Sequence, residues 1–155
     1  MKMKSVETRL QLLEDREEIR QLLMDYGRYL DKRDFASFSR LFAEKAGEWI
    51  GGMGQATGQQ AIRKLMEETI GRDTSGKIVG PNYHVFTNDV IHVDGDKATA
   101  STKWIFVVQS DQKQPQPFFL GHYEDTFIRE YGRWKFLRRV VYADIPTDDA
   151  VSQKR

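Results

Sequence analysis

The sequence contains no cysteine among its 155 residues. This absence excludes disulfide bonds, a thiol nucleophile and any metal site built on thiolates. An excess of charge of one sign is also missing, because 24 Lys and Arg residues face 23 Asp and Glu residues. The charge therefore predicts neither nucleic acid nor an anionic membrane surface as a partner.

Long apolar runs are missing as well. No stretch of eighteen apolar residues occurs, so the sequence predicts no membrane-spanning helix. The chain opens with Met-Lys-Met-Lys-Ser and continues into charged sequence without an apolar signal region, so we expect a cytoplasmic protein. Its length suits one domain with a proper core. We expect a single domain over residues 1–145 and a flexible polar tail over residues 146–155.

The histidines and glycines lack the spacing of a metal site or a nucleotide site. His84 and His92 share a predicted strand, on which eight residues span about 26 Å, so they cannot bind one ion. With His122, the three histidines of the chain show no short ligand spacing. The glycines within residues 51–54 do not fit the dinucleotide-binding pattern. We predict neither a metal nor a cofactor.

Amphipathic helices are predicted in the first half of the chain, where apolar residues recur every three or four positions. This spacing predicts three helices, over residues 6–31, 34–44 and 58–70. Residues 47–54 are aromatic and glycine-rich, which predicts a strand running into a tight turn. Residues 71–80 are predicted to form a loop.

From Asn82 onward the pattern changes to the alternation typical of β-strands. Strands of about 11 residues reach about 35 Å, and such a sheet has to twist and curl. We therefore predict an α+β fold, with three N-terminal helices packed on a strongly curved, mainly antiparallel sheet whose concave face holds a pocket. The predicted strands cover residues 83–93, 98–108, 118–130 and 133–143, with a tight hairpin at Asp94-Gly95 and a longer connection over 109–117.

Candidate pocket residues follow from the alternation. It places His84 and Phe86 on one face of the first long strand, and Trp104 and Phe106 on one face of the second. On the last two strands both faces are mixed, so the sequence leaves the inner face open. The full set of candidates is Trp49, Phe86, Trp104, Phe106, His122 and Arg139. Simpler roles stay open: core packing for the tryptophans, a structural hydrogen bond for His122, and a pair between Arg139 and Asp125.

Several segments together resemble one known group of proteins. They are Asp15-Arg-Glu-Glu-Ile-Arg-Gln-Leu-Leu, Tyr26 followed five residues on by Asp31, Asp34-Phe35 with Leu41-Phe42-Ala43-Glu44, His84 at the start of a strand, and Gly121-His-Tyr-Glu-Asp-Thr-Phe with Gly132-Arg-Trp. Over roughly residues 8–145 the chain resembles the SnoaL-like group of the nuclear-transport-factor-2-like superfamily. The resemblance implies a cone-like α+β barrel.

The resemblance also implies an activity, because the group includes scytalone dehydratase, a chlorinated-cyclohexane dehydrochlorinase and a bile-acid dehydratase. It implies a cofactor-independent lyase or isomerase acting on a small hydrophobic cyclic or carbonyl-bearing molecule. It assigns a catalytic dyad to His84 and Asp31 and an oxygen-polarising role to Tyr26. An arginine of the bile-acid enzyme falls on Ala143, and a second histidine of scytalone dehydratase is replaced near Trp104, so those two roles do not carry over. Such relatives are often dimers or trimers, and we expect a homo-oligomer.

The chemistry of these side chains agrees with that assignment. Histidine can accept a proton at neutral pH, a carboxylate on its other nitrogen fixes the tautomer, and a tyrosine hydroxyl can support developing negative charge. Five residues along a helix set Tyr26 and Asp31 about 140° apart, so both reach one pocket only if Asp31 lies at the helix end or beyond it. Three alternatives stay open: Asp31 as a turn residue, a non-catalytic small-molecule-binding protein, and an accessory β subunit of a ring-hydroxylating dioxygenase.

Overall fold

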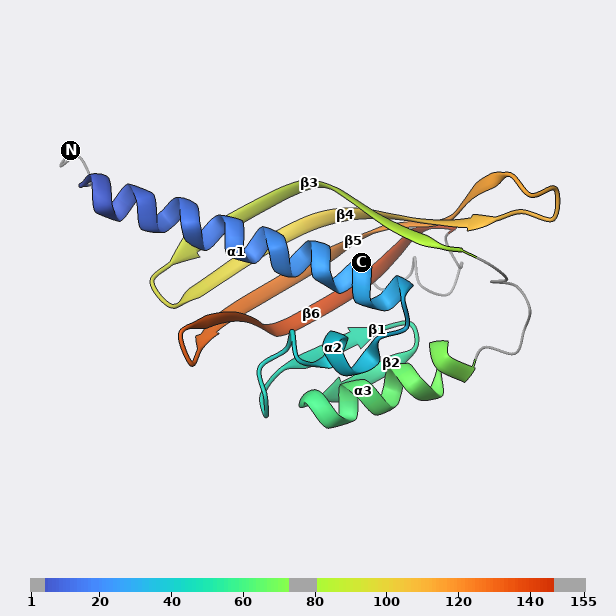
Figure 1. Ribbon diagram of the computed structural model, residues 1–155, viewed down its shortest axis with the longest axis horizontal. Coiled ribbons are helices and arrows are strands. Elements are labelled where there is room, and N and C mark those ends of the chain that lie inside the picture. Colours follow the sequence, from blue (N-terminus) through green and yellow to red (C-terminus); the bar gives the residue numbers. More distant parts are fainter. Residues whose placement is uncertain (1–4, 73–80, 147–155) are drawn as a thin grey trace.

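The computed structural model describes residues 5–72 and 81–146 of the chain (Figure 1). In chain order its elements are α1 (Val6–Asp31), α2 (Phe35–Ser39), β1 (Glu48–Gly51), β2 (Gly54–Thr57), α3 (Gln59–Glu68), the short 3-10 helix η1 (Ile70–Arg72), β3 (Tyr83–Asp94), β4 (Lys97–Gln109), β5 (Pro115–Glu130) and β6 (Arg133–Ile145). Most of the predicted loop over 71–80, and the predicted tail beyond residue 146, lie outside the described residues.

The strands form one six-stranded sheet in the order β2-β1-β6-β5-β4-β3. All neighbouring strands are antiparallel except β1 and β6, which run parallel. Figure 1 shows α1 running along one face of the long strands, with α2 and α3 beside β1 and β2. The predicted α+β class, with N-terminal helices on a mainly antiparallel sheet, is confirmed.

The first helix has the predicted bounds, and its ends have clear chemical causes. The Ser5 hydroxyl accepts a hydrogen bond from the backbone N–H of Thr8 at 3.2 Å and caps the start of α1. At the other end Arg33 adopts a left-handed φ of 55°, which turns the chain. Asp34 then caps α2 by accepting from the backbone N–H of Ser37 at 3.0 Å.

The second helix is shorter than the predicted range of 34–44, because the chain after it pairs with β6 instead. The backbone N–H of Ala43 donates to the carbonyl of Phe136 at 2.9 Å, and the N–H of Phe136 donates to the carbonyl of Leu41 at 3.0 Å. A helix continued to residue 44 could not make these bonds. The prediction over residues 40–44 was therefore wrong.

The four long strands match the prediction closely, with β5 starting at Pro115 rather than at residue 118. The glycine-rich stretch 47–54 holds β1 and the first residue of a return strand, β2, that was not predicted. β1 confirms the strand predicted within residues 47–54, whereas β2 is too short for its alternation to be recognised. The hairpin they form pairs with β6 and adds two strands to the sheet.

The inner face of β5 and β6, left open by the sequence, is set by a β-bulge. Phe127 pairs with Phe136 and Asp125 pairs with Arg139, so β6 carries one extra residue, Leu137, between these pairs. The bulge brings Phe136 and Arg139 to the same face, although they are three positions apart. The core lies between this face and α1, and its most completely buried side chains include Ile19, Leu23, Phe38, Phe42 and Phe136.

None of the helices in the described part of the chain is both long enough and apolar enough to cross a membrane.

Candidate functional site

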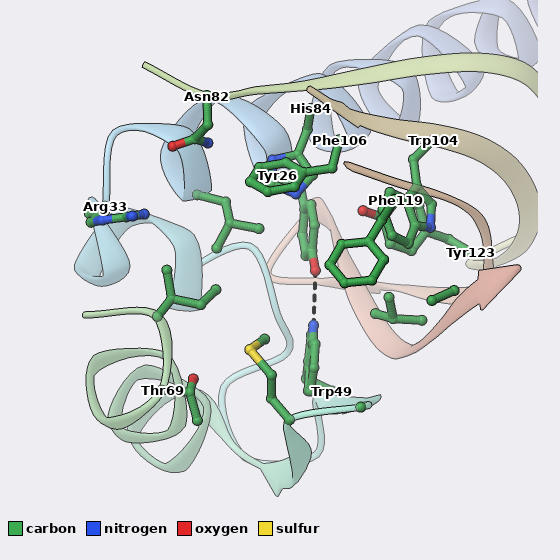
Figure 2. A pocket seen from close by; sticks show the side chains of 16 residues that line it. Tyr26, Arg33, Trp49, Thr69, Asn82, His84, Trp104, Phe106, Phe119 and Tyr123 are labelled. Atoms are coloured by element: carbon green, nitrogen blue, oxygen red, sulfur yellow. Dashed lines mark hydrogen bonds between the residues drawn. The ribbon is translucent and has the colours of Figure 1, made fainter. Parts of the chain in front are cut away.

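A cavity of about 590 Å³ opens between the C-terminal end of α1, the inner face of the sheet and the β1–β2 turn (Figure 2). A volume of this size suits a small organic ligand. Most of its walls are apolar or aromatic. They are formed by Tyr26, Leu30, Arg33, Trp49, Gly52, Met53, Thr69, Ile70, Asn82, His84, Trp104, Phe106, Phe119, Tyr123, Val141 and Ala143.

The two members of the predicted dyad meet beside this cavity. His84 Nδ1 lies 2.5 Å from Oδ1 of Asp31, the last residue of α1. The Asp31 carboxylate accepts two further hydrogen bonds, from Nδ2 of Asn82 at 2.9 Å and from the backbone N–H of His84 at 3.0 Å. The contact predicted between Asp31 and His84 is therefore present, and Asp31 reaches it from the helix end, as the helical geometry requires. The role of the pair in catalysis stays a prediction.

The carboxylate fixes the tautomer of His84. An ionised Asp31 can only accept hydrogen bonds, so in the neutral imidazole of His84 the proton is on Nδ1 and Nε2 keeps a free electron pair. The imidazole also packs against Phe106, with ring centroids 4.6 Å apart. Only 13% of the His84 side chain and 17% of the Asp31 side chain are exposed, so water weakens their interaction little.

A glycine allows α1 to come close enough to β3 for this contact. A Cβ atom at Gly27 would overlap the ring of Phe86 and lie 3.3 Å from Cβ of His84. Gly27 is buried inside α1, one turn before Asp31. The sequence pattern did not reveal this role, because a single glycine within a helix does not indicate what packs against it.

Tyr26 lies on the wall of the same cavity, and its hydroxyl accepts a hydrogen bond from Nε1 of Trp49 at 2.9 Å (Figure 2). Burial raises the pKa of Tyr26, while the Arg139 guanidinium and the Trp49 N–H act in the opposite direction. The raised pKa keeps the hydroxyl protonated at neutral pH. Tyr26 can therefore still donate its own proton to a ligand oxygen.

Behind the two tyrosines of the cavity lies a buried ion pair between Asp125 on β5 and Arg139 on β6. Two hydrogen bonds of 2.7 Å join the guanidinium to the carboxylate, and both side chains are fully buried. The guanidinium carbon lies 4.0 Å from the ring centroid of Tyr26 and 3.9 Å from that of Tyr123. The cross-strand pair between Arg139 and Asp125 is therefore present.

Three of the six predicted pocket residues line the cavity and three do not. Trp49, Trp104 and Phe106 form part of its wall. Arg139 does not, because the rings of Tyr26 and Tyr123 lie over its guanidinium.

Phe86 and His122 are the other two corrections. Phe86 packs behind the wall, against Gly27 of α1 and with its ring centroid 5.7 Å from that of Tyr123. His122 falls on the outer face of the sheet, because strand alternation places it opposite its buried neighbours Gly121 and Tyr123. There its Nδ1 lies 2.7 Å from Oδ2 of Asp144, and its ring stacks on Tyr142.

Several wall residues were missed by the sequence prediction, notably Arg33, Asn82, Phe119 and Tyr123. Of these, Tyr123 was the easiest to predict from the sequence, because strand alternation places it on the same face of β5 as Asp125, two positions away. For Arg33 and Asn82, which lie outside the regular elements, periodicity offers no signal.

A metal site would need several clustered acidic or histidine ligands. Within residues 5–72 and 81–146, no group of three or more His, Asp or Glu side chains could hold a metal ion.

Known proteins resemble this chain both in sequence and in fold. The sequence profile of the SnoaL-like domain matches residues 11–140. An uncharacterized protein of Mycobacterium tuberculosis (strain H37Rv) is 33% identical over 135 residues, which cover 83% of this chain and 84% of that protein. The crystal structure of an NTF2-like protein with a cystatin-like fold from Novosphingobium aromaticivorans is 27% identical, covers 99% of both chains and gives a TM-score of 0.80.

A candidate scytalone dehydratase, also from Novosphingobium aromaticivorans, is similar in fold. It is 24% identical, covers 89% of each chain and gives a TM-score of 0.69. At this identity the likeness concerns the fold, and the side chains of the cavity have to support any function by themselves.

Proposed function

The chain belongs to the SnoaL-like domain family, and from this premise we propose that it is a cofactor-independent lyase or isomerase of the dehydratase type. The family includes dehydratases and isomerases. The observation that carries the proposal is the 2.5 Å contact between His84 Nδ1 and Asp31 Oδ1 on the wall of a largely apolar cavity. The substrate would be a small hydrophobic cyclic or carbonyl-bearing molecule.

In this proposal His84 acts as the general base. Its Nε2 removes a proton from a substrate carbon next to a carbonyl group or a leaving group, and Asp31 stabilises the imidazolium that forms. In an elimination the proton then passes to the departing hydroxyl, so that water is lost and a double bond forms. In an isomerisation the proton returns to a different carbon. The apolar walls hold the substrate in either case.

Screening small cyclic ketones, hydroxy-ketones and halogenated rings for elimination, and for exchange of deuterium from solvent, tests this proposal. We expect His84→Ala to lower the rate by about 100- to 10,000-fold, because general-base catalysis contributes on that order. Asp31→Asn should lower the rate almost as much, since Asn favours the wrong tautomer of His84. Affinity for the substrate should change little in both variants, because the apolar walls are intact.

The outer face offers a matched control. His122 also lies against a carboxylate, that of Asp144, but outside the cavity. His122→Ala should therefore leave the rate unchanged.

A non-catalytic binding protein is the alternative, favoured by the apolar character of most of the cavity wall. The deuterium experiment separates the two functions. A ligand that binds tightly to the wild-type protein and is returned without exchange would contradict the enzyme proposal and support the binding protein.

A further inference from the structure

The two tyrosines on the cavity wall differ in their hydrogen bonding. The hydroxyl of Tyr26 accepts from Nε1 of Trp49. The hydroxyl of Tyr123 makes no hydrogen bond to any residue within the ranges 5–72 and 81–146. Tyr123 also lines the cavity. Since only 2% of Tyr123 is exposed, its hydroxyl faces the cavity rather than the bulk solvent.

The ring of Tyr123 is held in one orientation. On the neighbouring strand β6, the guanidinium of Arg139 lies 3.9 Å from the ring centroid. On the other neighbour, β4, the indole of Trp104 stacks with its centroid 5.6 Å away. The edge contact with Tyr26, at 5.5 Å, restrains the ring further. A polar group fixed in this way needs little reorganisation to bind a ligand.

The hydroxyl is also in the protonation state of a donor. Burial raises the pKa of Tyr123 well above its ordinary value, so the proton stays on the oxygen at neutral pH. Figure 2 shows the side chain entering from β5, with its hydroxyl directed toward the part of the cavity where Tyr26 and His84 lie. The Tyr123 hydroxyl has no hydrogen-bond partner in the described part of the chain, and a ligand oxygen in the cavity would supply one.

We infer that the hydroxyl of Tyr123 binds the oxygen atom of the ligand by donating a hydrogen bond to it. The ligand class is thereby narrowed to oxygen-bearing rings, such as cyclic ketones, phenols and alicyclic alcohols. This catalytic part of the inference rests on the proposed function. If the protein is an enzyme, the same hydrogen bond would stabilise the negative charge that develops on the ligand oxygen after His84 removes a proton. The oxygen contact itself would serve a binding protein equally well.

Two ring probes that differ by one oxygen test the inference: 2-naphthol and naphthalene, titrated by fluorescence against the full-length protein. The wild type should prefer 2-naphthol. Tyr123→Phe should weaken the binding of 2-naphthol by about tenfold, the effect of one hydrogen bond, and leave naphthalene binding unchanged.

Tyr26→Phe is a comparison for stability and not for binding, because Tyr26 lines the same cavity and its hydroxyl can also donate to a ligand oxygen. It removes the acceptor of the buried Trp49 N–H, so it should lower the melting temperature, whereas Tyr123→Phe should leave the melting temperature unchanged because no protein hydrogen bond is lost. Equal weakening for both probes by Tyr123→Phe, no weakening for either, or a wild type without preference for 2-naphthol would overturn the inference.

Failure of the proposed function is distinguishable from failure of this inference. If Tyr123→Phe discriminates between the probes and no substrate exchanges deuterium, the oxygen contact stands and only the proposed reaction fails. If turnover depends on His84 and the probes are not discriminated, only the role of Tyr123 fails.

Discussion

At the residue scale, the carboxylates of Asp31 and Asp125 near the cavity are both paired. Asp31 is satisfied by three donors, and Asp125 is bonded twice by Arg139. An unpaired charge at either place would carry a large desolvation cost. The cost of the Asp125–Arg139 pair is met by two charge-assisted hydrogen bonds and by the aromatic rings over the guanidinium.

Asp125→Asn should therefore destabilise the fold strongly. It leaves the fully buried guanidinium of Arg139 without a counter-charge, and we expect a loss of about 3–5 kcal/mol in the free energy of unfolding, measured by urea denaturation. Glu124→Gln, the adjacent exposed carboxylate on the same strand, is the control and should change stability little. Equal effects of the two substitutions would show that the buried pair does not contribute in this way.

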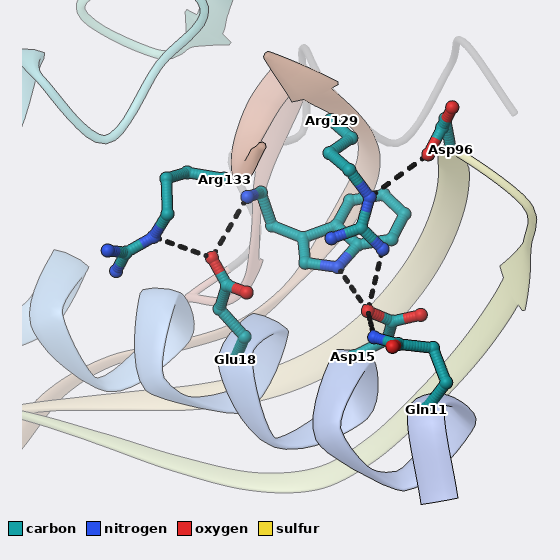
Figure 3. A network of polar contacts seen from close by, with 7 residues as sticks. Gln11, Asp15, Glu18, Asp96, Arg129 and Arg133 are labelled. Carbon is teal, nitrogen blue, oxygen red and sulfur yellow. Dashed lines mark hydrogen bonds and ion pairs between the residues drawn. The ribbon is translucent and has the colours of Figure 1, made fainter. Parts of the chain in front are cut away.

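At the scale of elements, α1 is attached to the sheet at both ends. Near its C-terminal end Asp31 binds the start of β3. Nearer its N-terminal end Asp15 binds the end of β5 and the start of β6 (Figure 3). Oδ1 of Asp15 accepts from Nη2 of Arg129 at 2.6 Å, from Nε1 of Trp134 at 3.1 Å and from Nε2 of Gln11 at 3.1 Å. The motif that begins at Asp15 therefore holds α1 against β5 and β6, and it does so at a site outside the cavity.

This network should make stability depend on pH. Burial opposes the charge on Asp15, but the hydrogen bonds from Arg129, Trp134 and Gln11 outweigh it and lower the pKa of the carboxyl from its ordinary value of 3.8. A lowered pKa in the folded state means that the stabilisation is present above the unfolded pKa, and is lost as the pH falls through the folded one.

Asp15→Asn should cost about 1–3 kcal/mol in the free energy of unfolding at neutral pH. The difference from the wild type should shrink as the pH falls below about 4, the ordinary pKa of Asp in the unfolded chain, and on through the lower pKa of Asp15 in the folded state. Denaturant unfolding between pH 7 and pH 2.5 measures it, with the exposed neighbour Glu14→Gln as control. A difference that stays constant over this range would rule out the ionised Asp15 as its source.

At the scale of the whole molecule, the outer face of the sheet carries exposed apolar side chains that the helices do not cover. Tyr83, Val85 and Val90 on β3 and Tyr142 on β6 are all exposed. We propose that a second copy of the chain covers this face, as expected from the sequence, with a trimer favoured over a dimer.

Light scattering at micromolar concentration should therefore give two or three times the mass of one chain. Tyr142→Lys should lower that mass, because it places a charge on the apolar face. Tyr131→Lys should not, since Tyr131 is 87% exposed on the β5–β6 turn. A monomeric wild type would contradict self-association and leave this face to a different partner, as in an accessory subunit.

The sequence pattern predicted more of the fold than of the candidate site. Periodicity predicted α1, α3 and the four long strands, because each pattern repeats over many residues and depends on neighbours a few positions away. The pairing of Asp31 with His84 was predicted from the resemblance alone. Composition and periodicity cannot bring together two residues that are 53 positions apart.

Other features depend on contacts between segments that are distant in the sequence, and only the tertiary structure decided them. Residues 41–43 pair with β6, and this pairing ends α2 early. β1 pairs with β6 in parallel, and this places Trp49 of β1 at the hydroxyl of Tyr26. The bulge at Leu137 shifts the alternation of β6 by one residue, so that Arg139 points to the inner face and is buried behind the cavity. Local sequence determined the elements because the helical repeat and the strand alternation are patterns among residues a few positions apart. The cavity depended on the register between strands, which is fixed by packing across the whole core.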